Sequence, residues 1–340
     1  RSVRLIWWLN GIRKDSISFN NLAVARNKDT VLVASPIAIN EGLHRLAVFT
    51  SRPNGQADEV PANDTLIRDF AVTGRASTPV TQGFENDNNA WQGWAPAPVF
   101  GAWQISNAAA QTGSHSLLLN RFADTSKSTV YELYSPVISP TAGADSLFLR
   151  YSWAAAGRST GPVAKTDTLE WWLTTDCGQT KQLLARRFGA DLAATSIEFP
   201  YTPATAGEWR TASIDLSNKL QALSGGFQVM ARGVAGGGNN IWLDEVQLFT
   251  KTIPAALKQE GFGVYPNPFA SSFLIWHLTP PTGWKSARLA DATGRVLRQW
   301  HWNGNAPQTL TVEAASLPKG LYFLELEYDG LKRTRKLLKL

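Results

Sequence analysis

Residues 264–269 read Val-Tyr-Pro-Asn-Pro-Phe, and the fold of the C-terminal end can be derived outward from this stretch. Pro266 and Pro268 lack a backbone N–H and fix φ at about −65°, so the stretch cannot continue a helix and starts as an extended arm. Tyr265 and Phe269 flank the prolines, and their rings can hold the arm against a core. A short, separate domain is therefore expected to begin here.

Turn and strand patterns follow the arm in a regular order. The run 291–294, Asp-Ala-Thr-Gly, lies between two apolar runs and predicts a hairpin turn with Gly294 at the position of positive φ. The run 318–320, Pro-Lys-Gly, predicts a second turn, and alternating apolar residues over 321–327 predict a half-buried strand. Residues 331–340 are expected to return as the last strand. Together these patterns predict a small antiparallel β-sandwich, similar to an immunoglobulin domain.

The same motifs carry a family resemblance. Their order and spacing over 263–340 resemble the type A C-terminal sorting domain of the type IX secretion system, also called the Por secretion system, of the Bacteroidota. The resemblance implies a sorting signal carried by Tyr265, Pro266, Asn267, Pro268, Phe269, Asp291, Gly294, Arg295, Gly320, Tyr322 and Lys336. It also implies a protein that is secreted and anchored at the cell surface, at the outer membrane. The expected partners of this domain are the secretion translocon and its outer-membrane shuttle barrel.

Length and composition limit the fold class. A chain of 340 residues is long enough for two or three domains with cores of their own. No long segment repeats apolar residues at helical spacing, and turn residues separate short apolar runs throughout, so the predicted class is all-β. The single Cys177 excludes an internal disulfide framework, and no apolar run reaches the length of a transmembrane helix.

The positive charge is concentrated at the C-terminal end. The whole chain has a net charge of +6, and residues 261–340 hold ten Lys and Arg against five Asp and Glu, a net charge of +5. Such an excess can mark a nucleic-acid-binding protein, but the cations within 332–336 fit the solvated face of a terminal strand. We therefore expect no nucleic-acid partner, and expect these cations to face acidic groups of an outer-membrane partner.

Residues 1–73 resemble an immunoglobulin-like adhesion module. Asn10-Gly11 is a hairpin-turn signal, and short apolar runs predict strands at 3–9, 17–22, 30–34, 44–50 and 64–72. Modules of this kind usually carry one more strand ahead of the first of these. The chain is therefore expected to be the C-terminal piece of a longer protein. Residues 74–79 are expected to form a linker.

Residues 80–250 predict a larger sandwich, and 251–262 a second linker. Short runs punctuated by Gly, Pro and Ser are typical of a jelly roll, with strands expected near 116–121, 130–138, 146–154, 167–174, 181–188, 209–216, 226–233 and 240–249. Phrases within this region resemble MAM-like and cleaved-adhesin jelly rolls, among them Gly-Phe-Glu-Asn at 83–86.

That resemblance implies a calcium ion. In such jelly rolls a structural calcium often ties the first strand to the last, and the matching acidic positions here are Glu85 and Asp244. The alternative is that both acids are edge residues that accept hydrogen bonds in turns.

Tryptophan is the second candidate for binding chemistry. Trp91 and Trp94 lie in a loop, Trp-Gln-Gly-Trp, where their rings are well placed to stack on a sugar, so they are the candidate ligand-binding residues. Tryptophans on predicted strands, including Trp171 and Trp172, are more often core, because each buries a large apolar area.

No catalytic motif is recognisable. The four histidines lie on separate segments, and the chain has neither a His-Glu-x-x-His pair nor a Gly-x-Ser-x-Gly elbow, so we expect no enzyme within these residues. The first hypothesis is a surface protein whose upstream β-domains are non-catalytic adhesion modules for a glycan or a surface protein. The second is the accessory tail of a larger secreted hydrolase, a metallopeptidase or glycoside hydrolase, whose catalytic domain precedes residue 1.

Overall fold

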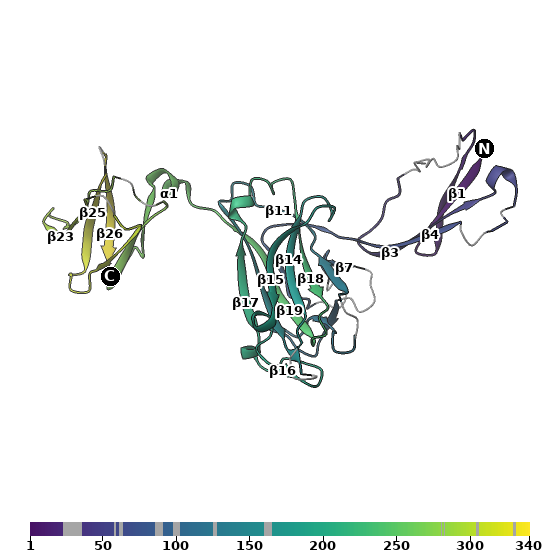
Figure 1. Cartoon of the computed structure of the whole chain (residues 1–340). Helices are drawn as coiled ribbons and strands as arrows, with labels where there is room; N and C mark the ends of the chain where they lie inside the picture. Colours follow the sequence, from purple (N-terminus) through teal and green to yellow (C-terminus); the bar gives the residue numbers. More distant parts are fainter. Residues whose placement is uncertain are drawn as a thin grey trace. The chain divides into compact units, whose positions relative to one another are not determined.

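The structure is a computed structural model of the 340-residue chain. It describes residues 1–22, 36–57, 59–60, 64–85, 91–97, 103–124, 128–159, 165–279, 281, 283–303, 306–328 and 331–340. These form two compact units, Arg1–Lys251 and Thr252–Leu340, both built almost entirely from strands (Figure 1). The predicted all-β class is confirmed. Among the described residues, no helix is long and apolar enough to span a membrane.

Four strands near the N-terminus form one antiparallel sheet in the order β2-β1-β3-β4. Their bounds are Val3–Leu9 for β1, Ile12–Phe19 for β2, Gly42–Ser51 for β3 and Thr65–Val72 for β4. The predicted turn joins β1 to β2, with φ of 52° at Asn10 and 77° at Gly11. The strand expected at 30–34 lies outside the described residues, and the described part of this segment forms a single sheet.

The predicted jelly roll is built from two sheets. One has the order β15-β14-β18-β10-β7, with bounds Gln182–Phe188, Thr168–Thr174, Gln228–Val234, Val130–Tyr134 and Ala95–Pro96. The other has the order β17-β12-β19-β9-β8, with bounds Arg210–Asp215, Ser146–Ala155, Ile241–Lys251, Ser116–Leu119 and Gln104–Ser106, and β6, Val80–Gln82, pairs with β19. Seven of the eight strands expected from the sequence are present as single strands, and the one expected near 130–138 is divided into β10 and β11, Val137–Ser139, which lie in different sheets.

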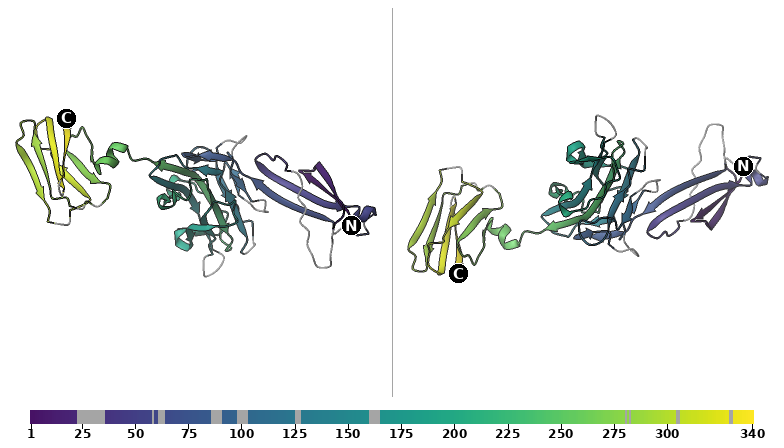
Figure 2. Two further views of the ribbon diagram at one scale, coloured as in Figure 1. Left: turned by 90° about the horizontal axis from the view of Figure 1, so that it is seen from above. Right: turned by 90° about the horizontal axis from the view of Figure 1, so that it is seen from below.

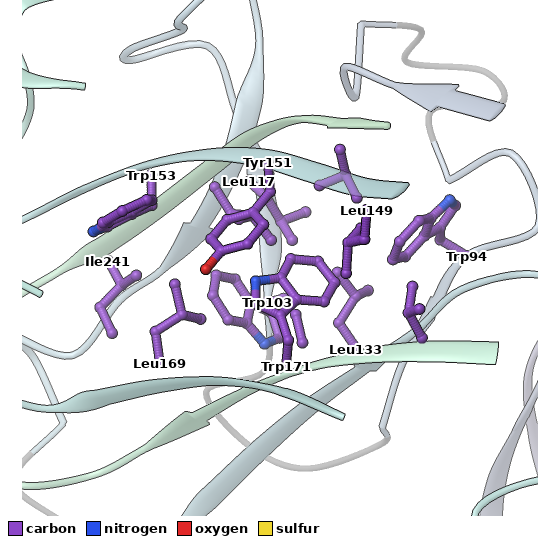
Figure 3. Close-up of a cluster of buried hydrophobic side chains, with 14 of the residues drawn as sticks. Trp94, Trp103, Leu117, Leu133, Leu149, Tyr151, Trp153, Leu169, Trp171 and Ile241 are labelled. Carbon is purple, nitrogen blue, oxygen red and sulfur yellow. The ribbon is translucent and has the colours of Figure 1, made fainter. Parts of the chain in front are cut away.

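Side chains from both sheets fill one core, which Figure 3 shows in close-up. Trp103 and Trp171 lie in its middle, and the Tyr151 ring packs 4.9 Å from that of Trp171. The Trp103 indole N–H donates to the Tyr131 carbonyl over 3.0 Å, so this buried donor is paired. Leu169, Trp171 and Leu173 of β14 point into this core. Because neighbouring residues of a strand point to opposite faces, Glu170 and Trp172 point outward.

Both expected linkers contain regular structure. Within 74–79, β5, Arg75–Ser77, pairs in parallel with β11, Val137–Ser139, and so belongs to the edge of the jelly roll. Within 251–262, the short helix α1, Ala255–Glu260, ends at Gly261 with φ of 78°. Two-residue strands β13, Gly157–Arg158, and β16, Ser196–Ile197, complete the first unit. These pieces are too short to leave a periodic pattern in the sequence.

The second unit is the expected small sandwich of a three-stranded and a four-stranded sheet. The order β20-β21-β24 covers Phe262–Tyr265, Ser272–His277 and Thr309–Glu313. The order β23-β22-β25-β26 covers Val296–His301, Ser286–Asp291, Gly320–Tyr328 and Leu331–Lys339. Figure 2 shows β25 and β26 side by side in yellow. Gly294, with φ of 86°, forms the predicted turn between β22 and β23. Phe262, Phe269 and Trp284 belong to its separate core.

Candidate functional site

The jelly roll presents charged and aromatic side chains on the solvent side of its five-stranded sheet. Strands β10 and β18 point alternate side chains into the core, namely Tyr131 and Leu133 of β10 and Val229 and Ala231 of β18. The residues between them along each strand therefore face outward. We call this surface the outer face and define it by Glu132, Tyr134, Glu170, Trp172, Lys181, Arg186 and Arg232.

Glu170 is the centre of the first group on the outer face. Glu170 is 3% exposed, and its carboxylate accepts from Arg186 Nε over 2.7 Å and from the Trp172 indole over 2.8 Å. A guanidinium nitrogen of Arg232 lies 3.7 Å from the second carboxylate oxygen. A buried carboxylate is tolerated only when it is paired in this way. The pairing therefore fixes one indole and two guanidinium groups at defined positions.

Glu132 is the centre of the second group. It accepts from Lys181 Nζ over 2.8 Å and from the Tyr134 hydroxyl over 2.5 Å. Burial pushes the pKa of Glu132 upward, but the hydrogen bonds from Lys181 and Tyr134 and the nearby cations together lower the pKa below its ordinary value. Burial, and then the bond to the Glu132 carboxylate, raises the pKa of Tyr134 well above its ordinary value. Both groups thus hold one protonation state around neutral pH.

An aromatic surface connects the two groups. Trp172 is half-buried and pairs across the strands with Met230, which is fully buried. The Arg232 guanidinium lies 5.5 Å from the Trp172 ring centroid, and Lys181 Nζ lies 5.7 Å from that of Tyr134. Each cation is thus held by an aromatic ring as well as by a carboxylate. The outer face therefore offers aromatic surface beside fixed donors and acceptors.

The structure corrects the expectation for Trp94. Its side chain is 3% exposed and packs edge-on against Phe84, with ring centroids 6.4 Å apart, so no face of the indole can stack on a sugar. Trp91 is half-buried and packs against the same Phe84 ring at 6.4 Å. A tight turn, in which Trp94 N donates to the Trp91 carbonyl over 2.7 Å, folds both indoles inward. Trp91 remains a prediction.

Trp172 is the residue that the sequence reasoning missed. Adjacent residues of a strand point to opposite faces, so Trp171 and Trp172 cannot both lie in one core. Trp171 is fully buried, and Trp172 therefore lies on the outer face. The Trp-Trp pair was the signal available in the sequence.

Glu85 and Asp244, the acids expected to bind calcium, approach each other beside Gly83. A Cβ atom at Gly83 would lie 3.6 Å from Glu85 Cγ and 3.9 Å from Asp244 Oδ1. Glu85 accepts from the backbone N–H groups of Ser114 and His115 over 2.7 and 3.2 Å.

Asp244 is fully buried and accepts backbone N–H bonds from Gln111, Thr112 and Glu245 over 2.8, 3.3 and 2.7 Å. Burial raises the pKa of Asp244 to about 6, although these hydrogen bonds act to lower the pKa. The oxygens of both acids thus already accept turn hydrogen bonds, which is the alternative considered for them. Within the described ranges, no group of three or more His, Cys, Asp and Glu side chains could hold a metal ion. The calcium site remains a prediction.

In the second unit, the first and last sorting motifs are joined. The Asn267 side-chain amide donates to the Lys336 carbonyl over 3.0 Å, and its oxygen accepts from Leu338 N over 3.0 Å. Phe269 N donates to the Leu338 carbonyl, and Leu340 N donates to the Phe269 carbonyl, each over 2.9 Å. Residues 267–269 therefore form an arch that closes over the end of β26.

Tyr322 links this arch to the other motifs. It is 3% exposed, its ring lies 6.3 Å from that of Phe269, and its hydroxyl donates to the Pro318 carbonyl over 2.6 Å. Across the sheet Tyr322 pairs with Asp291 on β22 and with Leu337 on β26. The fold thus gathers motifs from three parts of the sequence around one tyrosine.

The Asp291 turn is held by its own side chain. The carboxylate accepts from the hydroxyl and backbone N–H of Thr293 over 2.6 and 3.0 Å, and from Arg295 N and Nε over 3.1 and 3.0 Å. These bonds, that from the Thr293 hydroxyl above all, lower the pKa of Asp291. Tyr265 and Arg295 keep exposed side chains. The role of each of these residues in sorting stays a prediction.

Comparison with known proteins gives similar solved structures and one family match. No match was found among curated proteins. Solved structures similar to part of the chain include TmCBM61 in complex with β-1,4-galactotriose, at 12% identity and a TM-score of 0.33, covering 50% of this chain and 95% of that one. A cleaved adhesin domain of Lys-gingipain from Porphyromonas gingivalis has 13% identity, a TM-score of 0.35 and coverage of 50% and 97%. A xylan-binding domain from Paenibacillus barcinonensis has 12% identity, a TM-score of 0.32 and coverage of 53% and 99%.

A protein-family profile described as "Secretion system C-terminal sorting domain" matches residues 263–339. This range contains the arch, the Asp291 turn, Tyr322 and the last strand. Residues 263–339 are therefore a C-terminal sorting domain of the type IX secretion system.

Proposed function

We propose that this chain belongs to a surface protein, anchored at the outer membrane after export, whose jelly roll binds a glycan without catalysis. The observation that supports this role is the outer face, where Trp172 and Tyr134 lie among three cations and two carboxylates. The shuttle barrel and translocon expected from the sequence are the proposed partners of the sorting domain.

A glycan suits this surface because a sugar combines apolar C–H faces with many hydroxyl groups. Trp172 and Tyr134 provide aromatic surface, while Arg186 and Arg232 provide donors and the carboxylates provide acceptors. Ion pairs already hold these long side chains in place. Binding therefore costs less side-chain entropy than it would on a mobile surface.

The titration behaviour of the outer face favours binding over acid–base catalysis. General acid–base catalysis works best with a group whose pKa lies near the operating pH. Here the pKa of Glu132 is lowered and that of Tyr134 is raised, so neither exchanges a proton readily at neutral pH.

Glycan-array screening of the full chain, followed by calorimetry with the best ligand, tests this proposal. We expect Trp172→Ala to weaken binding about tenfold or more, because it removes the aromatic surface and a donor to Glu170. Phe199→Ala is the control, because Phe199 is 66% exposed and lies outside the outer face. Trp91→Ala tests the loop candidate separately. Unchanged binding by Trp172→Ala would move the site away from the outer face.

A further inference from the structure

A groove of about 500 Å³ runs along one side of the sorting domain, between β20 and β26. Gly263, Val264 and Tyr265 line it from β20, and residues 334–337 line it from β26. Leu274 and Trp276 of β21 extend the wall beside β20. Both strands are the outermost strands of their sheets, so the groove lies between two sheet edges.

The edge of β20 points backbone polar groups away from its sheet. Among the described residues, β20 pairs with β21 alone, and Leu278 N donates to the Gly261 carbonyl over 3.0 Å, which sets the alternation of the ladder. Alternate residues of a strand point their N–H and C=O groups to the same side. Gly263 and Tyr265 are two and four residues after Gly261, so their backbone N–H and C=O groups also point toward β21. The N–H and C=O of Val264 therefore face away from β21, along the groove.

The edge of β26 is only partly covered. The arch takes the Lys336 carbonyl and both backbone groups of Leu338, which shows that these residues point away from β25. With a period of two, the N–H and C=O of Thr334 and Lys332 point the same way. Among the described residues, the arch ends at Lys336, so the edge at Thr334 is open toward the groove. An unpaired edge of this kind is a template for an added strand.

The side chains along the groove are aromatic and cationic. Tyr265 is 78% exposed and Trp276 is 37% exposed, and neither ring is covered by a core. Lys336 is exposed, whereas Arg335 is held by an ion pair to Glu260 and lies 5.7 Å from the Phe262 ring centroid. No Asp or Glu side chain lines the groove within the described residues, and residues 261–340 carry a net charge of +5. The groove therefore favours a negatively charged occupant.

We infer that this groove binds an extended, acidic peptide segment of a partner protein as an added β-strand. Backbone pairing along Thr334 supplies affinity, and the exposed cation at Lys336 selects acidic side chains. The inference follows from the edges and charges of the sorting domain, and it does not depend on the glycan-binding role proposed for the jelly roll.

Fluorescence anisotropy with the full chain tests the inference. The probe is a labelled six-residue peptide that alternates glutamate and valine, and the comparison peptide has lysine in place of glutamate. We expect the acidic peptide to bind about tenfold or more tightly than the basic one. A third peptide, N-methylated at alternate residues so that it cannot donate to an edge, is expected not to bind.

Two matched proline variants locate the site. Thr334→Pro removes an outward N–H inside the groove, and Lys332→Pro removes the equivalent N–H outside it, and neither N–H belongs to the ladder with β25. We expect Thr334→Pro to weaken binding about tenfold and Lys332→Pro to leave it unchanged. Lys336→Glu is expected to reverse the preference toward the basic peptide.

Equal effects of the two prolines, or equal binding of the acidic and basic peptides, would overturn the inference. So would a dimer in sedimentation experiments that Thr334→Pro dissociates, because the occupant would then be a second copy of this chain.

Discussion

Asn267 and Lys336 are joined by a hydrogen bond from a side-chain amide to a backbone carbonyl, 3.0 Å long, between two motifs at opposite ends of the sorting domain. The amide oxygen of Asn267 accepts from the next outward N–H, that of Leu338. The side chain thus pairs with the edge of β26 in the way that a neighbouring strand would. Asn267 therefore completes a sheet edge.

Loss of this pairing is expected to loosen the end of β26. Asn267→Ala removes two hydrogen bonds, and we expect a local loss of about 1–2 kcal/mol, or roughly tenfold faster amide exchange over 336–340. Hydrogen–deuterium exchange with mass spectrometry measures this directly. Asn303→Ala, at an exposed loop asparagine, is the matched control. Unchanged exchange over 336–340 in Asn267→Ala would mean that the arch is held by Phe269 alone.

Removal of the sorting domain is expected to stop export. A chain lacking residues 263–340 should accumulate in the periplasm of its native cells, because the segment that matches the sorting family is gone. Surface labelling of intact cells, compared with labelling after lysis, measures the fraction exported. Arrival of the truncated chain at the surface would refute the sorting role of this segment.

Asp244 is expected to make the stability of the jelly roll fall as pH rises. Its pKa is about 6 in the folded state against 3.8 ordinarily, so its contribution is fully present below pH 3.8 and is lost as pH rises through 6. The expected change is roughly 3 kcal/mol at most. Urea unfolding of the wild type and of Asp244→Asn, compared from pH 4 to pH 7, isolates this change.

The same experiment tests the calcium prediction. If calcium binds at Glu85 and Asp244, the decline should appear in chelator and disappear in calcium, whereas a decline in both would favour the turn hydrogen bonds that these acids accept. A bound cation would favour the ionised carboxylate and remove the decline. A decline seen only in chelator would therefore support the metal site expected from the sequence.

His277 is expected to destabilise the sorting domain in acid. Burial lowers its pKa below 6.5, outweighing a backbone hydrogen bond with Gln308, and its ring lies 4.3 Å from that of Trp284. The unfolded chain therefore binds a proton first, so the free energy of unfolding falls as pH drops from 6.5 toward the folded pKa. Pulsed hydrogen exchange in urea, resolved over residues 262–340, measures the free energy of unfolding of the sorting domain at each pH. We expect its decline in acid to be smaller in His277→Gln. The control His301→Gln changes an exposed histidine and should keep the full decline. Identical profiles for the three proteins would contradict the assignment.

The sequence allowed the sandwiches to be predicted where strands are long and alternate regularly. The eight main strands of the jelly roll and the Gly294 turn leave clear periodic or turn signals. Short pairings such as β5 with β11 could not be predicted, because three residues carry no period and their partner is distant in the chain.

The sites were predicted less well than the fold, for a physical reason. Loop position favoured Trp94 as an exposed residue, but a tight turn folds its indole against Phe84. Exposure depends on the path of the loop, which residue type does not determine. The strand position of Trp172, by contrast, was informative, since its neighbour Trp171 occupies the core.

The arch imposes an order of events on the folding of the sorting domain. Its bonds join residues up to 71 positions apart, so Asn267 and Phe269 can pair only with a β26 that has already come to lie beside them. Closing a loop of this length costs conformational entropy before its hydrogen bonds can form, so the arch is expected to close late in folding. The closed arch is thus a sign that the sorting domain has reached its native topology, since the first motif cannot be paired before the last strand is in place.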